Sequence, residues 1–197
     1  MRQNIGFTVI DEGEETEEKN PAQELSDSNE MLEWLKFAVP EYCIKNNLYQ
    51  IVNNEIYIDF PWNYTKQIIE FPFKIKYVKG DFILNGSMLE SFKNFPDTVY
   101  GDLIMPNNRN LKSLKGCPSK IYGDFDVQGC GLTSLEHFPE YVDGNVFLKG
   151  NNFDSLAPLS GCMITKAIYL ESHQNADKYN KLSTTASDYI REKLSLV

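Results

Sequence analysis

The sequence contains few of the residues on which enzyme sites usually depend. It has two histidines and four cysteines in 197 residues. No Gly-x-Ser-x-Gly, His-Glu-x-x-His or phosphate-binding-loop pattern occurs in it. Cys43 and Cys130 fit neither a Cys-x-x-Cys pattern nor zinc-site spacing. We therefore expect no catalytic residues, no metal site and no cofactor, and we interpret the protein as a non-enzyme.

Long apolar runs and a basic stripe are also missing. No run approaches the roughly 18 apolar residues of a membrane-spanning helix. The start Met1-Arg2-Gln3-Asn4 lacks the charged-then-apolar pattern of a signal peptide. These features predict a cytoplasmic protein that does not engage a membrane. Without a basic stripe to attract phosphates, direct binding to nucleic acid is not expected.

The net charge of −9 is concentrated near the N-terminus. Residues 1–30 carry nine acids and two bases, a net −7, whereas residues 31–197 carry nineteen acids and seventeen bases, a net −2. The pattern predicts an acidic N-terminal arm and linker over residues 1–27. Two interpretations stay open: a solvated tail, or a mimic of phosphate charge directed at a nucleic-acid-binding partner.

A short motif occurs four times in the middle of the chain. It reads apolar-x-Gly-[Asp/Asn]-apolar-x-apolar, and its glycines, spaced by 21, 22 and 21 residues, are Gly80, Gly101, Gly123 and Gly144. A turn rich in Asn and Gly follows each copy, then a segment close to Leu-x-Ser-Leu-x-x-[Phe/Cys]-Pro. A fixed period in this range predicts a solenoid. The alternation after each glycine predicts a strand, with the glycine as a positive-φ corner before it.

The repeat resembles that of the bacterial and phage type of leucine-rich-repeat proteins. Arrays in that family read roughly V-G-G-D-F-D-C-S-N-N-x-L-T-S-L-E-G-A-P, and residues 123–136 are the nearest copy here. The resemblance covers residues 78–162 closely and about 55–177 loosely. It implies an α/β repeat fold: a short leucine-rich-repeat-like solenoid with a parallel sheet, capped by helical segments at both ends. It also implies a viral accessory protein that acts on a host component in the host cytoplasm.

The segments flanking the array predict its caps. Residues 28–54 are expected to form a helical N-terminal cap, with a helix from Ser28 or Asn29 and a hairpin turn at Asn53-Asn54. Residues 55–177 are expected to form about six coils, four of them clear at 78–162. Residues 178–197 are expected to end in a capping helix over Ser187–Leu196.

Alignment of the coils places Ile56 and Ile58 opposite Phe82 and Leu84, and this alignment predicts one row of outward strand residues. In coil order the row is Tyr57, Ile83, Ile104, Asp126, Phe147 and Tyr169. Five of these six side chains are apolar or aromatic, whereas a solvated strand face should be mostly polar. Because a contiguous exposed apolar row is typical of an interaction site, we expect it to bind another protein, such as a host defence or nucleic-acid enzyme.

A column of acids runs beside this row and is included in the predicted binding face: Asp81, Asp102 and Asp124. Their regular recurrence also fits a structural role, in which each carboxylate accepts a backbone N–H at the Gly-Asp corner. The row itself has two alternative explanations. Residues 5–10 of the same chain could cover it, or a second copy could, which would make this a self-assembling structural protein.

Overall fold

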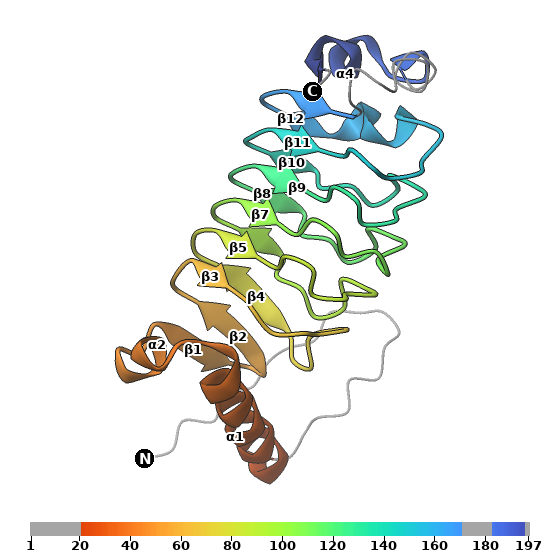
Figure 1. Ribbon diagram of the computed structural model, residues 1–197. Helices are drawn as coiled ribbons and strands as arrows, with labels where there is room; N and C mark the ends of the chain where they lie inside the picture. The colour runs from red at the N-terminus through yellow and green to blue at the C-terminus, as the bar shows by residue number, and fades with distance from the viewer. Residues whose placement is uncertain (1–20, 171–182, 196–197) are drawn as a thin grey trace, which may run out of the picture.

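The computed structural model describes residues 21–170 and 183–195. It shows an elongated solenoid of short stacked coils, with α1 and α2 at one end and α4 at the other (Figure 1). The predicted repeat solenoid with a parallel sheet is confirmed. The predicted acidic arm up to residue 20 and the segment 171–182 lie outside the described residues.

Each coil contributes to two parallel sheets instead of the single sheet predicted. Sheet A has the strand order β1 (Tyr49–Val52), β2 (Glu55–Ile58), β4 (Ile75–Val78), β6 (Thr98–Val99), β8 (Lys120–Ile121), β10 (Tyr141–Val142) and β12 (Met163–Ile164). Sheet B has the order β3 (Trp62–Asn63), β5 (Phe82–Ile83), β7 (Leu103–Ile104), β9 (Phe125–Asp126), β11 (Val146–Phe147), β13 (Ile168–Tyr169) and β14 (Leu194–Ser195). All pairings are parallel except that of β1 with β2. The third side of the solenoid is formed by the returning segments, one of which is the 3-10 helix η1 (Ala157–Gly161).

The Gly-Asp motif is the corner between the two sheets. In the first clear coil, Val78 ends β4 and Phe82 begins β5, so the corner is Lys79-Gly80-Asp81. Val78 and its equivalents are buried like the inward residues of sheet B, because both sheets face one core. The sequence repeat contained this second strand, but its two-residue length left no alternation from which to recognise it.

The predicted alignment of the first coil is wrong. Ile58 pairs with Val78 in sheet A, and Trp62 pairs with Phe82 in sheet B. The shift arises at the corner before Trp62, which contains Pro61 in place of the Gly-Asp motif. Pro61 packs against Gly80, where a Cβ would lie 2.7 Å from the proline Cγ, and Gly80 has φ +116°.

The N-terminal cap begins earlier than predicted. Helix α1 (Pro21–Ala38) starts at a proline, which suits the first helical position because proline has no N–H to leave unpaired. Residues 21–27 are therefore helix and not linker. Trp34 covers the first coil, with its ring edge-to-face on Trp62 at 6.1 Å and on Phe71 at 6.0 Å. Helix α2 (Glu41–Lys45) follows.

The predicted hairpin turn is confirmed between β1 and β2. Asn53 and Asn54 both have positive φ, at 50° and 58°. Two such residues in succession match the type I′ turn, whose twist suits a two-residue β-hairpin, and asparagine tolerates this conformation better than most residues.

The C-terminal cap closes the edges of both sheets. Helix α4 (Asp188–Lys193) has Ser187 as its N-cap, but it ends before the predicted Leu196 because the chain turns into β14 and pairs with β13. The Tyr189 hydroxyl accepts the Ile164 N–H at 3.0 Å and donates to the Ile164 carbonyl at 2.7 Å. Strand β12 thereby obtains hydrogen bonds from a side chain where a further strand would otherwise pair.

Two buried asparagines join neighbouring coils inside the core. The Asn108 amide donates to the carbonyls of Leu84 and Met105, both at 2.9 Å, and its oxygen accepts the Leu89 N–H at 3.2 Å. Asn151 makes the equivalent three bonds two coils later. Each asparagine satisfies buried backbone groups that the turn after the sheet B strand leaves unpaired.

Candidate binding surface

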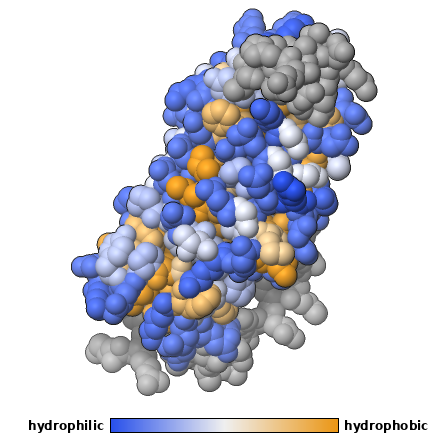
Figure 2. Space-filling model, in the orientation of Figure 1, coloured by the Kyte–Doolittle hydropathy of each residue, from blue (hydrophilic) through white to orange (hydrophobic). Residues whose placement is uncertain are grey.

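Five of the six predicted row residues lie in register on the outward face of sheet B. They are Ile83, Ile104, Asp126, Phe147 and Tyr169, which we call the sheet B row. All five are half-buried. Phe147 and Tyr169 stack with ring centroids 5.0 Å apart. Hydrophobic surface lies over β5 and β7 on the face shown in Figure 2.

Tyr57 does not belong to this row. It lies in sheet A, where it pairs with Tyr77, and Asn63 occupies the corresponding position of sheet B. The placement of Tyr57 in the row is therefore wrong, and the cause is the misaligned first coil. The strand that precedes the sheet B row therefore presents a polar residue, Asn63, at this position.

Asp126 is the one charged residue of the sheet B row. Burial raises the pKa of its carboxyl group, and hydrogen bonds from Gln128 oppose that rise. The Gln128 backbone N–H donates to the carboxylate at 2.9 Å and the side-chain amide donates at 3.2 Å. A carboxylate held among apolar neighbours in this way is positioned to receive a cationic group.

The aspartate column has a structural role. The Asp81 carboxylate accepts the Asp102 N–H at 2.9 Å, and the Asp102 carboxylate accepts the Asp124 N–H at 2.7 Å. Asp124 in turn accepts the Asn145 N–H at 2.7 Å. Each acid therefore joins its own coil to the next one, as the regular recurrence indicated. Their role in binding a partner stays a prediction.

At three of these corners glycine is required because atoms of the preceding coil leave no room for a Cβ, and not because the backbone has positive φ. Gly80 has positive φ, but Gly101, Gly123 and Gly144 do not. A Cβ on Gly123 would lie 2.6 Å from both the Asp102 nitrogen and the Gly101 carbonyl carbon. The aspartate ladder brings successive corners so close that only a hydrogen atom fits there.

A tyrosine ladder on the outward face of sheet A was not predicted. Its ring centroids are separated by 5.3 to 5.8 Å along Tyr57, Tyr77, Tyr100, Tyr122 and Tyr141. The rings of Tyr100 and Tyr122 are parallel within 6°, and these two residues are 51% and 44% exposed. The ladder uses two positions of the repeat, one for Tyr57, Tyr77 and Tyr141 and the other for Tyr100 and Tyr122, so no single repeat column displays all of it. The visible signal was the Tyr-Gly-Asp triplet, which occurs in two consecutive coils.

Charged groups surround the N-terminal part of this ladder. The Tyr77 hydroxyl donates to Asp59 at 2.7 Å. This hydrogen bond, with burial and the charge of Asp59, raises the pKa of Tyr77 to about 12. Lys76 bridges Glu55 at 3.4 Å and Asp97 at 3.0 Å.

Stability should therefore fall in strongly alkaline solution as Tyr77 ionises. Its folded pKa of about 12 exceeds the ordinary value of 10.0, so the folded state holds the proton more tightly. The resulting stabilisation is complete below pH 10 and is lost as the pH rises to about 12. Urea unfolding across this range should show a shallower pH dependence for Tyr77→Phe than for the native protein. An unchanged slope would mean that this hydroxyl is not the source.

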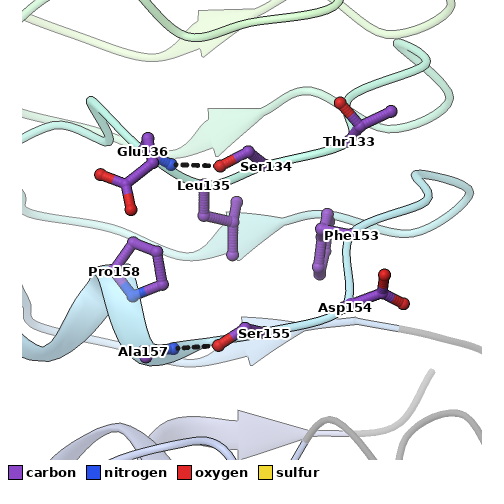
Figure 3. A pocket seen from close by; sticks show the side chains of 9 residues that line it. All are labelled: Thr133, Ser134, Leu135, Glu136, Phe153, Asp154, Ser155, Ala157 and Pro158. Carbon is purple, nitrogen blue, oxygen red and sulfur yellow. Dashed lines mark hydrogen bonds between the residues drawn. The ribbon is translucent and has the colours of Figure 1, made fainter.

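The third side of the solenoid has shallow hollows between coils. The hollow in Figure 3, of about 430 Å³, is lined by nine residues that include Phe153, Pro158 and Leu135. Ser134 and Ser155 accept the backbone N–H groups two residues ahead, each at 3.1 Å. The recurrent serine of the motif thus stabilises a turn.

The part of the chain that the structure describes holds no group of three or more His, Cys, Asp or Glu side chains that could bind a metal ion. Burial raises the pKa of the Cys130 thiol to about 12, so this thiol stays protonated at neutral pH. No helix within the described ranges is both long and apolar enough to cross a membrane.

Comparison with protein-family models, with curated proteins and with solved structures found no match to this chain. The resemblance to leucine-rich repeats of the phage type therefore stays a prediction.

Proposed function

We propose that this protein is a binding module that holds another protein against the sheet B row. The observation that carries the proposal is the contiguous outward row over five coils, in which four of five side chains are apolar or aromatic. Outward strand positions of a solvated sheet are normally polar, and contiguous apolar surface is typical of interaction sites. Binding through this row requires no catalytic group, which agrees with our expectation that the protein is not an enzyme.

The row indicates the chemistry of its partner. Asp126 lies between Ile104 and Phe147, so its carboxylate would be covered when a partner docks. A buried carboxylate requires an opposite charge, since an unpaired one is costly. The partner accordingly presents apolar side chains and a lysine or arginine that meets Asp126. The likeness of the repeat to phage arrays favours a host protein in this role.

A second copy of the chain suits the sheet B row poorly. If two rows packed face to face with the solenoids parallel, Asp126 would meet its own equivalent. If the solenoids were antiparallel about the middle of the row, which is Asp126 itself, Asp126 would again meet its own equivalent. Neither arrangement supplies a cation to the carboxylate, so a different protein is the better fit.

Loss of the apolar row is expected to abolish capture of the partner. The triple variant Ile83→Ser, Ile104→Ser and Phe147→Ser should bind at least about 100-fold more weakly, because apolar anchors at the centre of an interface dominate affinity. Affinity purification from native host extract with mass spectrometry identifies the protein that is captured. Titration with that purified protein then measures the change.

The matched control is the double variant Val52→Ser and Ile69→Ser, which removes apolar side chains that are 44% and 55% exposed outside the row. It should bind normally. Asp126→Lys should repel the partner, whereas Asp126→Asn should weaken binding less. If the folded triple variant captures the same protein with unchanged affinity, the row is not the binding surface.

A further inference from the structure

The outward face of sheet A has two columns of side chains. In each column, most pairs of residues at equal distances on either side of the midpoint are complementary in charge or in apolar character. The column within the strands reads Tyr57, Tyr77, Thr98, Lys120, Tyr141 and Met163. The next column reads Asp59, Lys79, Tyr100, Tyr122, Asp143 and Thr165. From Lys79 onward, each of these residues donates its backbone N–H to a carbonyl of the preceding coil. We call these the first and the second column.

We propose that two copies of this protein pair through these columns with their solenoids antiparallel. The two-fold axis lies along the strand direction, between the coils of Tyr100 and Tyr122. Such an axis keeps each column opposite itself and reverses the order of the coils, so one patch must complement itself. This pairing uses the opposite sheet from the sheet B row and does not depend on it.

The second column is self-complementary in charge. Tyr100 of one copy meets Tyr122 of the other, which places four exposed rings at the centre. Lys79 of one copy meets Asp143 of the other, and the symmetry produces this opposite-charge pair twice. Both side chains are exposed in the single chain, so each is accessible to the second copy.

The first column complements itself through aromatic and apolar contacts. The same axis sets Tyr77 opposite Tyr141, and Tyr57 opposite Met163. Met163 is 58% exposed, which is unusual for so apolar a side chain and is accounted for by a contact at the end of the interface. Thr98 and Lys120 meet beside the axis without a charge conflict.

The face also has a recess at the required place. A hollow of about 560 Å³ is lined by Tyr77, Lys79, Gly80 and Tyr100. The two-fold axis brings Tyr122, Tyr141 and Asp143 of the second copy over it. Side chains projecting from one copy therefore enter the hollow of the other, and the reverse contact is equivalent.

The size of the face sets the expected affinity. Six strands spaced by about 4.8 Å extend over roughly 24 Å. A stable interface usually buries about 800 Å² on each partner, and this narrow face lies at or below that value. The pairing is accordingly a weak, concentration-dependent dimer with a Kd in the micromolar range.

The test is a charge exchange followed by analytical ultracentrifugation over a wide range of protein concentration. Lys79→Glu places two acids opposite each other, and Asp143→Lys places two lysines opposite each other. Each variant alone should dimerise at least about tenfold more weakly than the native protein. Mixing the two variants should restore dimers, because each contact in the mixed pair again joins opposite charges. Circular dichroism checks that both variants fold.

A mixture that stays monomeric, while each folded variant is also monomeric, would refute the antiparallel pairing. So would a native protein that remains monomeric at every concentration. The triple variant of the sheet B row should dimerise normally, so failure of this inference and failure of the proposed function give different results. If dimerisation is lost in the sheet B variant and kept in the charge variants, self-association occurs through the other face.

Discussion

Replacing Gly123 by alanine is expected to lower the free energy of unfolding by about 3 kcal/mol or more. The new methyl group would overlap the Asp102 backbone and its carboxylate in the preceding coil. To make room, the corners must separate, and separation breaks the hydrogen bond from the Asp124 N–H to Asp102. The loss combines overpacking in a rigid stack with a charge-assisted hydrogen bond, so it should exceed the effect of an ordinary surface substitution.

Urea unfolding followed by circular dichroism measures this effect. Both tryptophans lie at the N-terminal end, so tryptophan fluorescence reports separately on the first coils. Gly161→Ala is the matched control, because a Cβ there meets no atom within 4 Å and its φ is not in the positive region. The control should be neutral or slightly stabilising. Equal stability of the two variants would contradict the close stacking of the corners.

Replacing Asn108 by leucine should destabilise the protein by about 2 to 6 kcal/mol. The substitution removes all three hydrogen bonds of a fully buried amide. The Leu84 carbonyl and the Leu89 N–H would then be buried without a partner, and each such group costs about 1 to 3 kcal/mol. The Met105 carbonyl would keep only its contact with the Cys130 thiol. The added apolar surface does not offset this cost, since the backbone groups stay in place around the new side chain.

Thermal and urea unfolding of Asn108→Leu should be compared with Asn110→Leu, which changes an exposed asparagine two residues away. The Asn110 variant should stay within about 0.5 kcal/mol of the native protein. Asn108→Asp keeps the acceptor for the Leu89 N–H and loses both donors, so it should also be strongly destabilised. A mild effect in both Asn108 variants would show that water replaces the lost amide.

The coil architecture could be predicted because inward positions recur at a nearly constant spacing. Phe82, Leu103, Phe125 and Val146 differ in size but all face the core, and their recurrence is sufficient to predict stacked strands. The first coil was misaligned because its corner contains Pro61 and lacks the Gly-[Asp/Asn] motif that marks the next four corners. The helix start was placed too late because residues 21–27 are mostly polar in sequence and therefore resemble a linker.

The candidate surfaces differed in how readily they could be predicted. The sheet B row occupies a single repeat position, so aligning the copies was enough to find it from Ile83 to Tyr169. The tyrosine ladder is divided between two repeat positions and crosses from one to the other between Tyr77 and Tyr100. Its continuity becomes visible only when the register of sheet A is known. Lys79 and Asp143 both precede the motif glycine, so their opposite charges could be read from the aligned copies, but the outward direction of that column could not.

The closed C-terminal end has a consequence for how such a chain can change over evolutionary time. The Tyr189 hydroxyl and β14 fit the last coil alone, and Trp34 fits the first coil alone. Each boundary between interior coils is built from the same contact, an aspartate carboxylate that accepts an N–H of the next coil, so one interior coil can stack on another in the same way. Duplication or deletion of one whole interior unit therefore preserves both ends, so the length of the array can vary by whole coils while its termini are inherited unchanged.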